Sequence, residues 1–338
     1  MSTRAFLAGV LLCCALVLAG CDGSILRQDV TEDSTRILGR RVTVVVTTDG
    51  GRRLVTHQSL RIQRGETPLD VLGRVADVRL APDGTIAQVN GEGGGALRAF
   101  GPEQAAWFYR IDGIESLGVR PDRYRLSPGQ TVWWDLRRFD IYERLPVAVG
   151  LFPEPLFSGW RDAEQPLRIS YGSDFKQDAE FFRDSVFQRI EPSIVSIKGD
   201  DGFAGIGGED GRSDSSLGGT VAVRKGRANF IIARWEDVRM DPNILEMNLG
   251  SQEYGLTAWI EGTEVRRRDP DMEFSEVVRD AEGVVWAGTV DGEPDGTLVF
   301  LVTGTTDEGV HAAARALRSG ACQFYLACLV RRDGSVIN

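Results

Sequence analysis

The chain has 338 residues, of which 42% are hydrophobic and 26% are charged, and its formal net charge at pH 7 is -10. These values are typical of a folded globular protein with room for about two domains. Nucleic acid and anionic lipid would both be repelled by an acidic surface, so we expect no nucleic-acid partner.

The first 20 residues have the pattern of an export signal. Arg4 precedes an apolar run from Ala5 to Gly20, which is shorter than a relaxed membrane span but matches the core of a signal peptide. The run ends in "LAGC", which is similar to the bacterial lipobox. We expect cleavage between Gly20 and Cys21, after which the Cys21 thiol carries a diacylglycerol. The alternative is an ordinary cleaved signal with a chance cysteine.

Lipidation of Cys21 predicts a lipoprotein on the extracytoplasmic face of the cell membrane. A diacylglycerol brings two acyl chains, such as palmitate, and two chains anchor a protein stably where one is marginal. No run of 18 apolar residues follows Cys21, so the rest of the chain is expected to be tethered rather than embedded. Residues 21–39 are polar and lack hydrophobic periodicity, which predicts a tether.

Residues 40–141 predict an α+β domain with one helix on a mixed sheet. The β-branched run "RVTVVVTT", the turn "DGG" and the segment "RLVTHQSLRI" favour two strands. "ETPLDVLGRVADV" has helical spacing, with Thr67 as cap and Pro68 as first helical residue. Strand patterns return in "TIAQVNG", "AAWFYRIDG" and "TVWWDLRRF".

Four successive segments of this domain carry a family resemblance: "ETPLDVLGRVA", "IAQVNG", "WFYRIDG" and "YRLSPGQTVWW". Over about residues 41–140 the chain resembles the transcobalamin-C-terminal-like domain, a β-grasp-related family of unknown function that is common in bacterial surface lipoproteins. Asp112-Gly113 stands where that family usually has Asn-Gly, and Gly129-Gln130 where it has Gly-Asp; both keep turn chemistry. The helical barrel that holds cobalamin in transcobalamin is absent, so the resemblance does not carry cobalamin binding to this chain, and we expect no cofactor.

Two aromatic strands in this domain present alternating faces. We expect one face of each strand to lie in the core, namely Trp107, Tyr109 and Ile111 with Val132, Trp134 and Leu136. Trp133 points the other way, and it either covers the second domain, the reading we favour, or offers a stacking surface to a ligand. If a ligand binds, the expected place is a groove between the two domains. The candidate ligand-binding residues there are Trp133, Tyr109 and Asp112.

Residues 145–333 predict an α/β domain, which resembles a companion domain found in actinobacterial lipoproteins. The segment 147–155 and "PLRISY" are strand-like, and "KQDAEFFRDSVF" predicts an amphipathic helix with Phe181, Phe182 and Val186 toward the core. Residues 199–219 form a long glycine-rich acidic loop. The C-terminal segments "TLVFLVTG", "TDEGVHAAARALRSG" and "CQFYLACLV" predict strand, helix and strand in a parallel or mixed sheet.

The chemistry-bearing residues are few. His57 and His311 lie far apart in the sequence, and the acidic loop lacks EF-hand spacing, so we expect no metal site. Cys322 and Cys328 are expected to be buried free thiols, because a disulfide would need a chain reversal between them. Ser173 and Lys176 match the S-x-x-K spacing of penicillin-recognising enzymes, but the partner motifs are missing.

The sequence therefore favours a non-enzymatic binding or interaction module whose partners are the membrane, through the lipid anchor, and a small-molecule or cell-wall ligand. No catalytic residue is predicted. One alternative is a cell-envelope hydrolase that uses Ser173 and Lys176, or a pair of carboxylates that no motif identifies. Another is a structural accessory subunit of a membrane complex, which would need no open cleft.

Overall fold

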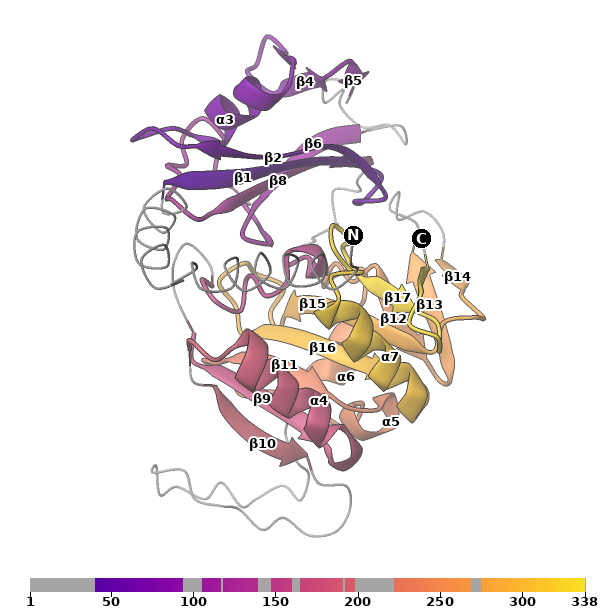
Figure 1. Ribbon diagram of the computed structural model, residues 1–338. Helices are drawn as coiled ribbons and strands as arrows, with labels where there is room; N and C mark the ends of the chain where they lie inside the picture. The colour runs from indigo at the N-terminus through magenta and orange to yellow at the C-terminus, as the bar shows by residue number, and fades with distance from the viewer. Residues whose placement is uncertain are drawn as a thin grey trace, which may run out of the picture.

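The computed structural model describes residues 40–93, 105–116, 118–138, 147–159, 165–190, 192–197, 222–268 and 275–337. Within these ranges the chain is a mixed α and β protein made mostly of sheet, with 18 strands and five α-helices. A five-stranded and a seven-stranded sheet lie one above the other (Figure 1). The two expected segments 1–20 and 21–39, the acidic loop 199–219 and the junction 141–145 lie outside the described residues.

The five-stranded sheet has the order β2-β1-β8-β6-β7. Its strands are β1 (Arg41–Thr48), β2 (Arg53–Arg61), β6 (Ala105–Ile111), β7 (Ile114–Glu115) and β8 (Thr131–Arg138). The central strands β1 and β8 are parallel and all other neighbours are antiparallel. The predicted strand "RVTVVVTT" is confirmed from its first residue to its last.

Helix α3 (Pro68–Val75) covers one face of this sheet. The Thr67 hydroxyl accepts from the Asp70 amide while the Asp70 carboxylate accepts from the Thr67 amide, so the predicted cap is confirmed as a capping box. Val71 and Leu72 pack on the expected aromatic face, which includes Tyr109 and Trp134. Strands β3 (Val78–Leu80), β4 (Ile86–Val89) and β5 (Glu92–Gly93) form a small sheet beside the helix.

The seven-stranded sheet has the order β10-β9-β11-β16-β15-β17-β18. Its strands are β9 (Leu167–Gly172), β10 (Ser193–Ile197), β11 (Ala228–Ile232), β15 (Gly283–Thr289), β16 (Leu298–Gly304), β17 (Cys328–Val330) and β18 (Val336–Ile337). Strands β10, β9, β11 and β16 are parallel. Strand β15 is antiparallel to both β16 and β17, so β16 and β17 run parallel to each other. The sheet is therefore mixed, as predicted for the C-terminal segments.

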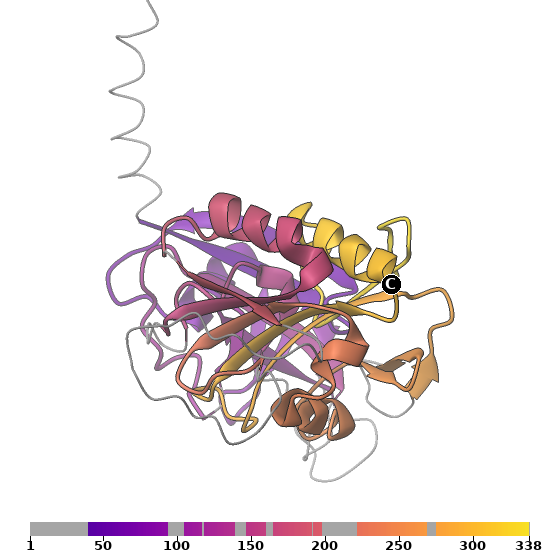
Figure 2. The same ribbon diagram turned by 90° about the horizontal axis from the view of Figure 1, so that it is seen from below.

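Helices cover both faces of the seven-stranded sheet. Helices α4 (Lys176–Phe181), continued by a π-helix (Phe182–Val186), and α7 (Asp307–Arg318) pack on one face. Helices α5 (Trp235–Val238) and α6 (Pro242–Leu249) pack on the other, and the view from below shows the two pairs on opposite sides (Figure 2). Strands β12 (Ala258–Glu261), β13 (Glu264–Arg268) and β14 (Ser275–Val277) form a separate three-stranded sheet beside the seven-stranded sheet.

Three expectations for the second half are wrong. The segment 147–155 is not a strand: Val147 forms a single bridge to Ile114, and a 3₁₀ turn follows at Val149–Leu151. Phe181 is exposed whereas its neighbour Phe182 is fully buried, because the turn of the helix directs only one of two adjacent side chains to the core. In "CQFYLAC" residues 322–324 form a turn, residues 325–327 are irregular, and only the last cysteine begins β17.

Candidate functional site

The face of the five-stranded sheet that points away from α3 packs against the C-terminal part of the chain. Val45 of β1 and Trp133 of β8 form a small apolar cluster with Ala148, Phe324 and Leu326. The Trp133 indole nitrogen donates to the Thr47 hydroxyl at 2.8 Å, and its ring lies edge-on to Phe324 at 6.5 Å. Trp133 therefore lies in the contact between the sheets, the position we favoured for it.

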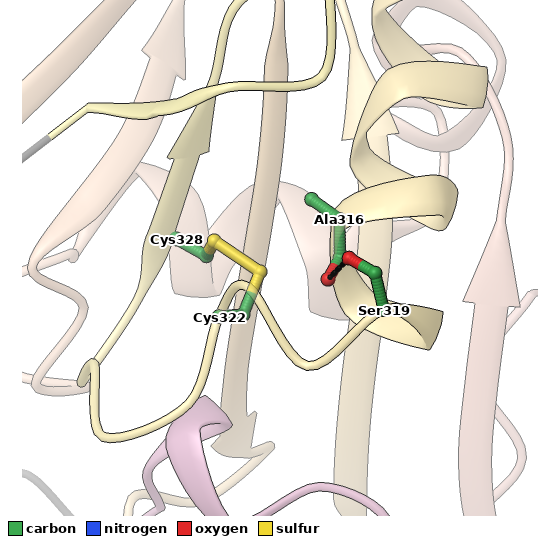
Figure 3. Close-up of a disulfide and its surroundings, with 4 residues drawn as sticks. All are labelled: Ala316, Ser319, Cys322 and Cys328. Atoms are coloured by element: carbon green, nitrogen blue, oxygen red, sulfur yellow. Dashed lines mark hydrogen bonds between the residues drawn. A yellow bond between two sulfur atoms is a disulfide. The ribbon is translucent and has the colours of Figure 1, made fainter.

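The loop 322–328 provides the other side of this contact. It returns on itself and is closed by a disulfide between Cys322 and Cys328, whose Cα atoms are 5.5 Å apart (Figure 3). The expectation of free thiols is wrong, because the turn at 321–324 supplies the reversal that the spacing requires. The cysteine that begins β17 is thereby fixed to the turn that follows α7.

Backbone hydrogen bonds hold this loop against the segment at 149–150. The Val149 amide donates to the Leu326 carbonyl at 3.1 Å, and the Gly150 amide donates to the Tyr325 carbonyl at 2.8 Å. The Phe324 amide donates to the Gly150 carbonyl at 3.0 Å. A Cβ on Gly150 would lie 2.4 Å from the Phe324 nitrogen, so only glycine permits this approach. Phe324 itself has φ of 67°, a conformation that is costly for a side chain of its size.

A cavity of about 370 Å³ lies between the five-stranded sheet and this loop, within the usual range for small-molecule sites. Its walls come from β1, β2 and β8 on one side and from the 149–152 segment, the end of α7 and the 322–328 loop on the other. The lining residues are Thr43, Val45, His57, Thr131, Val149, Gly150, Leu151, Phe152, Leu317, Gly320, Cys322, Gln323 and Phe324.

The sheet pairing places the polar side chains of the cavity on one face. Thr43 of β1 is the direct partner of Thr131 of β8, and Val45 is the partner of His57 on β2. Paired residues on neighbouring strands share a face, and alternate residues of β1 share it too, so Thr43, Thr131 and His57 all face the cavity. The His57 ring also contacts Phe324 edge-on at 5.1 Å. His57 is thereby held at the cavity wall.

A group of buried charges lies on the same face of the sheet, farther along β6 and β8. Arg110 and Arg137 both donate to one oxygen of Glu115, at 3.3 and 3.1 Å. The Asp135 carboxylate accepts from the Thr47 hydroxyl at 2.6 Å and from the Gly51 amide at 3.2 Å. Burial lowers the pKa of Arg110 to about 10 and raises the pKa of Asp135. These groups fix the sheet against its surroundings and do not line the cavity.

The three residues named as ligand candidates from the sequence lie outside the cavity wall. Trp133 is fully buried in the contact between the sheets. Tyr109 lies on the opposite face, under α3, and its hydroxyl donates to the Val119 carbonyl at 2.7 Å. Asp112 lies in the turn after β6, where its carboxylate accepts from the Thr131 amide at 2.7 Å. The structure therefore does not bring these three together.

Sequence reasoning missed Thr43, Thr131 and Gln323, and it treated His57 as an isolated histidine. The available signal was the alternation of β1, where Thr43 and Val45 fall on the face opposite the core residues Val42, Val44 and Val46. Nothing in the sequence shows that the loop 322–328 lies on that face, because about 280 residues separate the two segments.

The remaining sequence candidates lie apart from the cavity. The Lys176 ammonium pairs with Glu180 at 3.7 Å, and both Lys176 and Ser173 are exposed. His311 is held by Asp178, whose carboxylate oxygen lies 2.6 Å from its Nδ1 atom, and this contact joins α7 to α4. Gly20 and Cys21 precede the described residues.

A second, smaller pocket of about 40 Å³ lies on the other side of the loop 322–328 and has room for little more than a water molecule. Arg52, Arg267 and Arg268 line it together with Tyr325. Its volume makes it a packing defect of the interface rather than a ligand site.

Within the described ranges, no group of three or more His, Cys, Asp or Glu side chains is arranged to hold a metal ion. None of the helices in these ranges is both long and apolar enough to span a membrane. A scan against protein-family models finds no match for the chain, and a search of the curated proteins finds none either.

Proposed function

We propose that this chain is a lipid-anchored extracytoplasmic protein that binds a small ligand in the cavity between its two large sheets. The anchor is supported by the signal-like first 20 residues and by Cys21 directly after them. The Cys322–Cys328 disulfide also supports export, because disulfides persist mainly in oxidising compartments.

We further propose a β-grasp-like N-terminal domain of the transcobalamin-C-terminal-like kind, followed by an α/β domain. The order β2-β1-β8-β6-β7, with a parallel central pair and one helix after the first hairpin, supports the first assignment. Four parallel strands with helices on both faces support the second. Under this assignment the cavity lies between the two domains, where ligand sites are common.

The observation that carries the binding function is the cavity together with its polar side chains, which make no hydrogen bond within the part of the chain that the structure describes. Among the described residues, no hydrogen bond engages the side chains of Thr43, His57, Thr131 or Gln323. A partly enclosed cavity that presents such groups beside apolar walls has the makeup of a small-molecule site.

A cavity-filling variant tests this proposal. The full chain, held in a polyoxyethylene detergent, is screened by thermal shift against a library of small molecules. We expect some compounds to raise the unfolding temperature of the wild type but not of Thr131→Phe, in which the added ring occupies the cavity. Gln58→Phe, at an exposed position of β2 outside the cavity, is the matched control and should keep the response. A response that persists in Thr131→Phe, or a library with no stabilising compound, would contradict binding at this place.

A further inference from the structure

We propose that the cavity takes a neutral ligand rich in hydroxyl groups, of the carbohydrate class. This inference rests on the proposed binding function and names the chemistry of the same site. Three observations lead to it: the described part of the cavity wall carries no carboxylate, ammonium or guanidinium group, its polar side chains both donate and accept hydrogen bonds, and its apolar part includes the ring of Phe324.

The absence of charge is the first observation. Of the lining residues that the structure describes, 13 in number, none is Asp, Glu, Lys or Arg, although 26% of the chain is charged. On this face of the sheet Arg110, Arg137 and Glu115 are paired with one another. Arg41, two residues before Thr43 on β1, donates to the Ser59 hydroxyl. A charged ligand would lose its hydration without meeting an opposite charge, which is costly. The described part of the wall therefore offers an ion no opposite charge.

The hydrogen-bonding groups are the second observation. A threonine hydroxyl, a glutamine amide and a neutral imidazole can each donate and accept a hydrogen bond. The cavity presents four such groups, namely the hydroxyls of Thr43 and Thr131, the amide of Gln323 and the imidazole of His57. A hydroxyl group on a ligand also donates and accepts, so a ligand with several hydroxyls can satisfy all four side chains. His57 and Gln323 are exposed, but a purely apolar ligand would displace water from the half-buried Thr43 and Thr131 hydroxyls without replacing its hydrogen bonds.

The apolar wall is the third observation. Phe324 is held by the disulfide loop and by its backbone hydrogen bond to Gly150, and Leu151 and Val149 continue the apolar surface, while the Phe152 ring packs into the core beside Phe300. The C–H face of a sugar ring is apolar while its edge carries the hydroxyls, so it matches a wall of aromatic carbon beside neutral polar groups. The volume of about 370 Å³ suits one or two rings.

Binding of a matched set of small molecules to the full chain, measured by ligand-detected NMR in polyoxyethylene detergent, tests the ligand class. The neutral probes are glucose, N-acetylglucosamine and maltose. Glucuronic acid and glucosamine supply the same ring with a negative or a positive charge, and tetrahydropyran supplies it without hydroxyls. We expect Kd for the neutral sugars to be at least about tenfold lower than for the charged or unsubstituted rings.

Two isosteric variants locate the site. Thr43→Val and Thr131→Val remove one hydroxyl each and should each raise Kd for the neutral sugars by about three- to tenfold. Thr56→Val is the control, since Thr56 pairs with Val46 on the opposite face of the sheet, and its Kd should equal that of the wild type.

The outcomes separate this inference from the proposed function. If a charged probe or tetrahydropyran binds best and Thr131→Val weakens it, the cavity binds ligands but the carbohydrate class is wrong. If none of the probes binds, the carbohydrate class is likewise overturned, while the thermal-shift screen with Thr131→Phe decides the binding function. Sugar binding that Thr43→Val and Thr131→Val leave unchanged would place it elsewhere and overturn the inference.

Discussion

At the scale of single residues, Asp135 is a carboxyl group whose charged form is disfavoured by its surroundings. Its side chain is fully buried, and burial raises its pKa above the ordinary value of 3.8, although the Thr47 hydroxyl and the guanidinium groups of Arg110 and Arg137 act in the opposite direction. The folded protein therefore binds the Asp135 proton more tightly than the unfolded chain does. The stability that this difference contributes is fully present below pH 3.8 and is lost as the pH rises through the raised value.

Asp135→Asn should remove this pH dependence. The amide keeps an oxygen that accepts from Thr47 and Gly51 but cannot ionise. We expect the free energy of unfolding of the variant, relative to the wild type, to increase from acidic to neutral pH. Urea unfolding at a series of pH values measures this difference.

Asp122→Asn provides a control of opposite sign. The Asp122 side chain is 35% exposed, and its hydrogen bond from Arg120 lowers its pKa. Its contribution is present above the unfolded value and is lost as the pH falls, so the relative stability of this variant should decrease from acidic to neutral pH. If both variants changed with pH in the same direction, the account of Asp135 would be wrong.

At the scale of elements, the loop 322–328 connects the two large sheets. It follows α7, begins β17 and presents Phe324 to β1, β2 and β8. A Cβ on Gly51 would lie only 1.7 Å from the Phe324 carbonyl oxygen, so the turn after β1 also fits closely against this loop. The position of one short loop therefore sets both the contact between the sheets and one wall of the cavity.

Removing the disulfide should loosen this loop. The disulfide limits the conformations open to the unfolded chain, and for so short a loop this stabilises the folded state by about 2 kcal/mol. The double variant Cys322→Ser/Cys328→Ser loses this contribution. We expect its free energy of unfolding in urea to fall by about that amount, and reduction of the wild type to have the same effect. The reductant should leave the double variant unchanged. Equal stability of oxidised and reduced wild type would contradict the role given to the disulfide.

At the scale of the whole molecule, the proposed anchor and the proposed cavity assign separate tasks to separate parts of the chain. Residue Arg40 begins the described N-terminal region and leads directly into β1, a central strand of the five-stranded sheet. A tether at 21–39 would therefore join the lipid to the sheet that forms one wall of the cavity. A lipid-anchored binding protein would hold its ligand close to the membrane surface in this way.

Cys21→Ser tests the anchor. The serine cannot form the thioether, so we expect the chain to move from the membrane fraction to the soluble extracytoplasmic fraction or to keep its signal uncleaved. Mass spectrometry of the mature amino terminus should find a diacylglycerol on Cys21 of the wild type and none on the variant. Cys14→Ser, inside the segment expected to be removed, should behave as the wild type. A wild-type terminus without lipid would refute the assignment.

Local patterns allowed several elements to be predicted from the sequence. The extent of β1, the capping box at Thr67 and the core face of Tyr109 and Trp134 each depend on residues a few positions apart. Alternation and helix capping are short-range effects, so neighbouring residues are enough to determine them. The segment 147–155 was predicted wrongly because its apolar run describes burial, which a 3₁₀ turn satisfies as well as a strand does.

The sequence by itself determined which faces of the strands are apolar and where α3 begins, because these depend on neighbouring side chains. Only the tertiary structure decided that Cys322 meets Cys328, that Phe324 lies over the β1 face, and that Thr43, Thr131 and Gln323 surround one cavity. These contacts join segments far apart along the chain. Such contacts form only when whole sheets pack, and no local pattern specifies which exposed strand face receives which loop.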